Sequence, residues 1–161
     1  MQTVLTLNAP TLVATLRSRA FRRAGVCLEV GMIHAPLSEE EERIATAIVD
    51  CAYRMHMGLG PGLIESVYET CFCHELSSHG LSFKRQAPVP ITYDGMLLEE
   101  KLRLDVLVED LVIVELKSVE VMHPVYLAQI LTYLKLADRR LGFLINFNVA
   151  KLKDGITRMA L

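Results

Sequence analysis

The most informative part of the chain reads Leu104-Asp105-Val106-Leu107-Val108-Glu109-Asp110-Leu111-Val112-Ile113-Val114-Glu115-Leu116-Lys117. Two runs of Val, Leu and Ile flank the polar pair Glu109-Asp110, which predicts two β-strands joined by a hairpin loop. Asp105, Glu115 and Lys117 interrupt these apolar runs. Charged groups within apolar strands are costly unless they face one another, a metal ion or a substrate. The functional site is therefore expected here.

The spacing of these charges indicates which of them can meet. Glu115 and Lys117 are two residues apart, so they share a face of one strand. The position of Asp105 depends on the length of the hairpin loop. A two-residue loop pairs Asp105 with Val114 and turns its carboxylate to the other face, whereas a three-residue loop at 109–111 pairs it with Glu115. We predict an odd-length loop or a bulge, and carboxylates on opposite faces would contradict a shared site.

A pair of adjacent carboxylates indicates a cation site, because two negative charges side by side repel each other. Carboxylate oxygens completed by water are suited to Mg²⁺ or Mn²⁺. Lys117 beside such an ion would orient or deprotonate a water molecule, or stabilise charge on a phosphate. The alternative interpretation is a surface salt bridge. The flanking apolar residues argue against it, since they predict that both faces of these strands are covered.

The sequence on either side predicts the remaining elements. Ser38 with Glu41 forms a capping box, which predicts the start of a helix. Further elements are expected as a helix over about 63–78, strands at 82–86, 89–93, 97–108 and 111–118, a helix from Pro124 to about 137, and a last strand at 141–147. A helix between the last two strands predicts a crossover and hence a mixed sheet. We expect an α/β (α+β-like) fold in which an antiparallel meander belongs to a mixed sheet flanked by helices.

Length and charge indicate the domain organisation. The 161 residues fit one domain with a sizeable core. Residues 1–31 hold four arginines and one acid, whereas residues 32–161 carry 13 basic and 18 acidic side chains, a net charge of −5. We expect an N-terminal extension over 1–37, or an organelle transit peptide, followed by one domain over 38–161. The acidic balance of the domain by itself weakens a nucleic-acid function.

Composition also bears on the location of the protein. No run of 18 uncharged apolar residues is present, so no transmembrane helix is expected. The four cysteines show no spacing typical of zinc sites or disulfide frameworks. Reduced thiols in a cytoplasmic protein are the expected consequence.

Three motifs resemble those of a nuclease superfamily. Asp105 followed by Glu115-Leu116-Lys117 resembles the core of the PD-(D/E)xK nuclease superfamily. The run Gly62-Leu63-Ile64-Glu65-Ser66-Val67-Tyr68 resembles the signature of its GxxExxY family, and Gln129-Ile130-Leu131-Thr132-Tyr133 is similar to the Q-x-x-x-Y motif of RecB-type nucleases. The runs at 144–148 and 152–156 are also similar to the end of that family. The resemblance covers about residues 36–161, with Leu104 where the superfamily motif has Pro.

The resemblance implies a restriction-endonuclease-like core and a metal site. By resemblance, Asp105, Glu115 and the carbonyl of Leu116 bind Mg²⁺ or Mn²⁺. Glu65 is implied as a further ligand, or as a group that orients a metal-bound water. Lys117 is implied to act on the attacking water, and the implied activity is hydrolysis of phosphodiester bonds in DNA.

The helical motifs carry additional expectations. Gln129 and Tyr133 are i,i+4 neighbours on a helix, and the resemblance implies that they contact the phosphate backbone or brace the lysine. Each motif residue also has a structural interpretation. Glu65 fits a first-turn acid favoured by the helix dipole, Tyr68 a packing aromatic with a satisfied hydroxyl, and Gly62 a turn into the helix.

Two other functions compete with a DNA nuclease. The first is a non-catalytic scaffold or interaction module that retains the nuclease-like fold. The acidic balance of the domain favours it, whereas the intact set of Asp105, Glu115 and Lys117 argues against it. The second is metal-dependent chemistry on a nucleotide or another phosphate ester.

Overall fold

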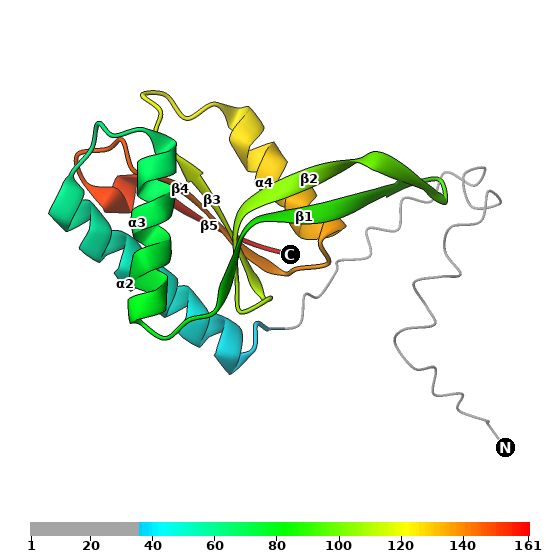
Figure 1. The fold of residues 1–161 in the computed structure, drawn as a ribbon, viewed down its shortest axis with the longest axis horizontal. Helices are drawn as coiled ribbons and strands as arrows, with labels where there is room; N and C mark the ends of the chain where they lie inside the picture. Colours follow the sequence, from blue (N-terminus) through cyan, green and yellow to red (C-terminus); the bar gives the residue numbers. More distant parts are fainter. Residues whose placement is uncertain (1–35) are drawn as a thin grey trace, which may run out of the picture. The chain divides into compact units, whose positions relative to one another are not determined.

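The computed structural model describes residues 36–161. Its helices are α2 (Glu39–Leu59), α3 (Glu65–Ser78), α4 (Pro124–Leu136) and the 3₁₀ helix η2 (Leu152–Asp154), and its strands are β1 (Phe83–Tyr93), β2 (Met96–Val108), β3 (Val112–Lys117), β4 (Leu141–Asn146) and β5 (Ile156–Ala160) (Figure 1). Residues 1–35 of the predicted extension lie outside the described part, so the boundary at residue 38 stays a prediction. No helix between residues 36 and 161 is long and apolar enough to span a membrane.

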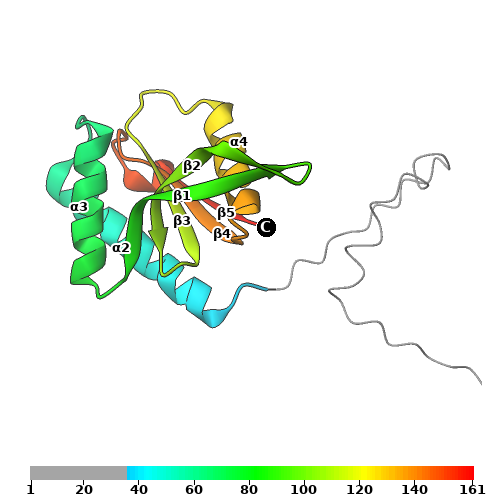
Figure 2. The same ribbon diagram turned by 45° about the vertical axis from the view of Figure 1, so that its right-hand side comes forward.

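The five strands form one mixed sheet in the order β1-β2-β3-β4-β5. Strands β3 and β4 are parallel and joined through α4, while the other neighbouring pairs are antiparallel. The predicted meander and crossover are thereby confirmed. Helices α2 and α3 pack on one face of the sheet and α4 on the other (Figures 1 and 2).

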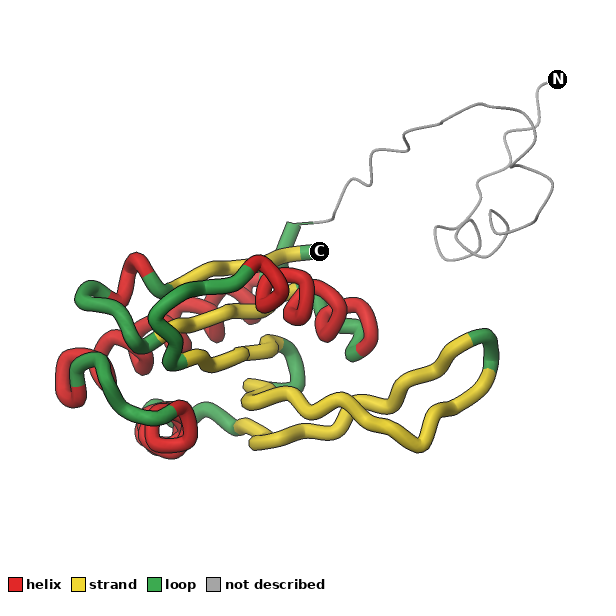
Figure 3. Tube along the Cα trace, turned by 90° about the horizontal axis from the view of Figure 1, so that it is seen from above, coloured by secondary structure: helices red, strands yellow, loops and turns green. Residues whose placement is uncertain are grey.

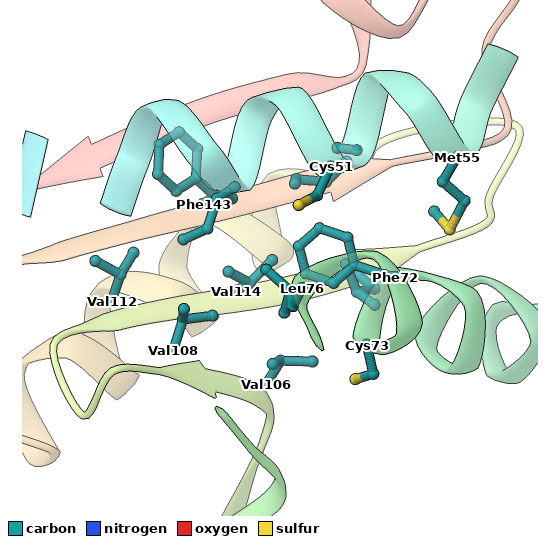
Figure 4. Close-up of a cluster of buried hydrophobic side chains, with 14 of the residues drawn as sticks. Cys51, Met55, Phe72, Cys73, Leu76, Val106, Val108, Val112, Val114 and Phe143 are labelled. Carbon is teal, nitrogen blue, oxygen red and sulfur yellow. The ribbon is translucent and has the colours of Figure 1, made fainter. Parts of the chain in front are cut away.

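The larger hydrophobic core lies between the sheet and the helices α2 and α3. Cys51 and Met55 of α2, Phe72 of α3 and Val114 of β3 are among its buried side chains (Figure 4). Burial of such apolar surface is the main favourable term in folding. A smaller core joins α4 to the other face of the sheet, where Ile130 is fully buried.

The predicted capping box begins α2 as expected. The backbone N–H of Glu41 donates to Ser38 Oγ at 3.1 Å, and the N–H of Ser38 donates to Glu41 Oε2 at 2.7 Å. These two bonds satisfy N–H groups that a helix start otherwise leaves without partners.

The sheet differs from the prediction at its two edges. Residues 83–93 form one strand rather than two, because Pro88 lies in the edge strand β1, where a missing N–H costs least. Strand β5 was not predicted. Its sequence Ile156-Thr-Arg-Met-Ala lacks the apolar alternation of a half-buried strand, and it pairs with β4 at the opposite edge. Figure 3 shows that the β1–β2 hairpin extends beyond the other strands.

The loop between β2 and β3 sets the register of the site. Glu109 and Asp110 both have positive φ, 52° and 55°, and the N–H of Leu111 donates to the carbonyl of Val108 at 3.0 Å. Val108 pairs with Val112, so three residues separate the strands, as predicted. Continued along the strands, this register sets residue 105 opposite residue 115.

Candidate active site

Asp105 and Glu115 lie side by side where β2 meets β3. Asp105 Oδ2 accepts a hydrogen bond from the backbone N–H of Leu116 at 2.9 Å, and Glu115 Oε1 accepts one from the N–H of Asp105 at 3.4 Å. Each carboxylate is thus held by the backbone of the opposite strand. The side chain of Glu115 is only 3% exposed and that of Asp105 is 17% exposed.

The ammonium group of Lys117 brings carboxylates from three elements together. Its Nζ lies 3.7 Å from Asp105 Oδ2 on β2, 3.9 Å from Glu115 Oε2 on β3 and 3.7 Å from Glu65 Oε2 on α3. The same Nζ donates to the carbonyl of Leu116 at 2.6 Å. Four oxygen-bearing groups therefore surround one largely buried cation.

Glu65 reaches the site because α3 begins at this residue. The preceding turn uses Gly62, whose φ of +101° suits glycine. Ser118, which follows Lys117, donates its hydroxyl to the carbonyl of Leu63 at 2.5 Å. This bond ties the loop before α3 to the end of β3.

Tyr68 fixes the same loop from inside the core. Its side chain is fully buried and its ring stacks on Phe147, with 4.9 Å between the centroids. Its hydroxyl donates to the carbonyl of Gly60 at 2.7 Å and accepts from the N–H of Leu63 at 3.2 Å. The structural interpretation of Tyr68 is confirmed, because the hydroxyl is satisfied by the loop that leads to Glu65.

Burial and crowding raise the pKa values of two acids in the site. Burial raises the pKa of Glu115 to about 8, with the Asp105 carboxylate adding to the rise and Lys117 opposing it. Partial burial also raises the pKa of Glu65, an effect that Lys117 opposes and Asp105 reinforces. With a pKa of about 8, the carboxyl group of Glu115 is mostly protonated at neutral pH in the metal-free protein.

The donor set of the site suits a hard divalent cation. Carboxylate and carbonyl oxygens are the ligands that Mg²⁺ and Mn²⁺ prefer, and the ammonium of Lys117 stands in for a cation among them. Within residues 36–161, no three His, Cys, Asp or Glu side chains are close enough to hold an ion as they stand. The candidate ligands are therefore Asp105, Glu115 and the Leu116 carbonyl, completed by water, as magnesium sites commonly are.

Gln129 and Tyr133 lie together on α4 and are bonded to each other. Gln129 Nε2 donates to the hydroxyl of Tyr133 at 2.6 Å. In the described part of the chain, no hydrogen bond or ion pair joins either residue to Lys117 or to the three acids.

The residue of α4 that does approach the lysine is Tyr126, which the sequence interpretation missed. Lys117 Nζ lies 5.8 Å from the centroid of the Tyr126 ring, within the range of a cation–π contact. Tyr126 is three residues before Gln129 and seven before Tyr133, so the three share one face of the helix. This helical spacing could have identified Tyr126 from the sequence as a neighbour of Gln129 and Tyr133.

Comparison with known proteins places the chain in a family. A family model described as the PD-(D/E)XK nuclease superfamily matches residues 42–159. This range spans Glu65, Asp105, Glu115 and Lys117, and the mixed five-stranded sheet flanked by helices is consistent with a restriction-endonuclease-like fold. No curated protein and no solved structure matches the chain.

Proposed function

Because the chain belongs to the PD-(D/E)XK nuclease superfamily, we propose that it is a metal-dependent nuclease that hydrolyses phosphodiester bonds in DNA. The observation that carries the proposal is the position of Lys117 Nζ, within 4 Å of carboxylate oxygens of Glu65, Asp105 and Glu115. The motif at 62–68 further supports membership in the GxxExxY family, close to RecB-type nucleases.

Asp105, Glu115 and the carbonyl of Leu116 would hold the metal ion, with Glu65 as a further ligand or as the group that orients a bound water. A bound Mg²⁺ or Mn²⁺ ion supplies Lewis acidity, lowers the pKa of water and neutralises phosphate charge. Glu115 binds a cation only after losing its proton, since a neutral carboxyl group is a poor ligand.

Lys117 has the chemistry to assist the attacking water or to stabilise the charge that develops on the phosphate. Its ammonium is bonded to the carbonyl of Leu116, one of the proposed ligands. Lys117 Nζ would be available for water or phosphate if the carbonyl of Leu116 served as a metal ligand rather than as its acceptor. Gln129 and Tyr133 would contact the DNA backbone from α4 through their amide and hydroxyl groups.

The test compares the full chain with two matched lysine variants. Supercoiled, linear and single-stranded DNA are incubated with Mg²⁺ or Mn²⁺ and the wild type, Lys117→Ala or Lys135→Ala. Lys135 is an exposed lysine in the last turn of α4. We expect cleavage by the wild type and Lys135→Ala, and a loss of roughly 100-fold or more in Lys117→Ala. Equal cleavage by all three proteins would overturn the proposal.

The acidic balance of residues 32–161, with 13 basic and 18 acidic side chains, favours a second candidate. Proteins that hold DNA are commonly basic, so this charge fits a scaffold module that retains the fold without catalysis. A wild type that cleaves no DNA and binds no Mn²⁺ would support that function. Hydrolysis of a free nucleotide or a simple phosphodiester, without cleavage of DNA, would instead indicate a small phosphate ester as substrate.

A further inference from the structure

The buried acid Glu69 lies on α3 one turn after Glu65. The residue is 9% exposed and both of its carboxylate oxygens are occupied. Arg85 Nε donates to Oε1 at 2.8 Å, and Gln86 Nε2 donates to Oε2 at 3.0 Å. Glu69 thus connects α3 to two successive residues of β1.

Gln86 has a backbone conformation that is unusual for its residue type. Its φ is +48°, in the left-handed region that favours glycine. Arg85 pairs with Val106 and Ala87 with Leu104, so Gln86 stands opposite Asp105. Such strained positions persist only where the surrounding structure holds them, and they cluster at functional sites.

Stability alone does not account for this arrangement. The side chain of Arg85 is 45% exposed, and an ion pair with one exposed partner contributes little after solvent screening. Burying the Glu69 carboxylate costs desolvation free energy, and the attraction within such an ion pair outweighs that cost only slightly. The use of three polar side chains here is better explained by what they fix in space.

The three side chains fix the distance between Glu65 on α3 and Asp105 on β2. Glu65 and Glu69 are i,i+4 neighbours and lie on the same side of α3. Asp105 lies on β2, directly across from the residue that Glu69 holds. Any shift of α3 along β1 would therefore move Glu65 away from Lys117 and Asp105.

We propose that Glu69 is a positioning residue of the site. Acting through Arg85 and Gln86, it locks α3 to β1 at the level of Asp105, so that the Glu65 carboxylate reaches the Lys117 ammonium. The functional meaning of this role rests on the proposed nuclease function. The geometric role of Glu69 does not rest on that function, and it is tested in the metal-free protein.

Two variants of the full chain break the connection in different ways. Glu69→Gln keeps the size of the side chain and removes its charge. Gln86→Gly removes the amide and at the same time relieves the positive φ, so it cannot act by straining the backbone. The matched control is Lys84→Ala on the same strand, which removes an exposed ion pair between Lys84 Nζ and Asp110 Oδ1 at 2.6 Å.

The first readout is the NMR contact between Lys117 Hε and Glu65 Hγ in the metal-free protein. We expect this nuclear Overhauser effect to be lost in Glu69→Gln and Gln86→Gly and kept in Lys84→Ala. Contacts between the stacked rings of Tyr68 and Phe147 should persist in all variants, which excludes general unfolding. An unchanged contact between Lys117 and Glu65 in Gln86→Gly would overturn the proposal.

The second readout is Mn²⁺ affinity, measured by electron paramagnetic resonance. We expect about a tenfold loss in Glu69→Gln and Gln86→Gly, typical of groups that orient metal ligands, and no change in Lys84→Ala. Wild-type affinity in both variants would overturn the positioning role. A wild type that binds no Mn²⁺ would count against the nuclease function, and the NMR contact would still decide the role of Glu69.

Discussion

Lys117 Nζ lies 3.7 Å from Glu65 Oε2, so the last residue of β3 meets the first residue of α3 through an ion pair. The same ammonium balances Asp105 and Glu115, which lie within 4 Å of it. In the metal-free protein, the lysine therefore performs the charge neutralisation that a bound cation would otherwise provide.

Lys117→Met should separate the effect of the lysine charge from that of its apolar stem, because methionine keeps the stem and removes the charge. We expect the free energy of unfolding at pH 9 to fall by roughly 3 kcal/mol, the lower end of the range for breaking a buried ion pair. The loss should be smaller at pH 5, where the carboxyl of Glu115 keeps its proton. Urea unfolding at both pH values measures the difference.

Added Mn²⁺ should restore much of this loss, since the ion replaces the missing positive charge. Lys135→Met, which changes an exposed lysine of α4, should show neither effect. A loss of stability that is the same at pH 5 and pH 9, and that Mn²⁺ does not reduce, would show that Lys117 acts only through packing of its stem.

The raised pKa of Glu115 predicts how stability depends on pH. The carboxyl has a pKa of about 8 in the folded protein against an ordinary value of 4.5. Between these values the folded state holds a proton that the unfolded chain has released, so stability falls as pH rises. Glu115 lowers the free energy of unfolding by up to about 1.4 kcal/mol for each pH unit between these two pKa values, and this decrease levels off above pH 8.

Glu115→Gln isolates this contribution. The variant should be nearly as stable as the wild type at pH 5 and more stable than it at pH 8.5, because an amide carries no charge to bury. Thermal unfolding of both metal-free proteins across this range provides the measurement. Parallel pH profiles would mean that Glu115 stays ionised in the folded protein.

The register of the site was predictable because side chains alternate along a strand with a period of two. Only an odd-length loop brings residues 105 and 115 to one face, and the hairpin with its three-residue loop follows from that requirement. The capping box at Ser38 and the crossover through α4 were equally predictable, since each depends on short-range sequence signals.

Contacts between distant elements were not predictable in this way. Arg85 and Glu69 are 16 residues apart, on a strand and a helix, and no spacing rule relates them. The single strand β1 was missed because Pro88 usually interrupts a strand, and only its place at the sheet edge makes it acceptable. The roles of Gln129 and Tyr133 stay predictions.

Tyr68→Phe should loosen the loop that leads to Glu65 while leaving the core packed. The phenyl ring still stacks on Phe147, but the carbonyl of Gly60 and the N–H of Leu63 lose their partner. We expect a loss of about 1–2 kcal/mol in the free energy of unfolding and faster amide hydrogen exchange at Leu63.

The control for the Tyr68 hydroxyl is Tyr53→Phe. The side chain of Tyr53 is 37% exposed, and the described residues give its hydroxyl no hydrogen bond. This variant should match the wild type in urea unfolding. Equal loss in the two variants would remove the specific role of the Tyr68 hydroxyl.

Tyr126 should affect the site through its ring rather than its hydroxyl, since Lys117 Nζ lies 5.8 Å from the ring centroid. Tyr126→Leu should slow DNA cleavage about two- to fivefold, which corresponds to the 0.5–1 kcal/mol of a cation–π contact. Tyr126→Phe keeps the ring and should cleave at the wild-type rate. The ring-current shift of the Lys117 Hε signal should follow the same order in NMR spectra. If Tyr126→Phe were as slow as Tyr126→Leu, the hydroxyl rather than the ring face would be the functional group.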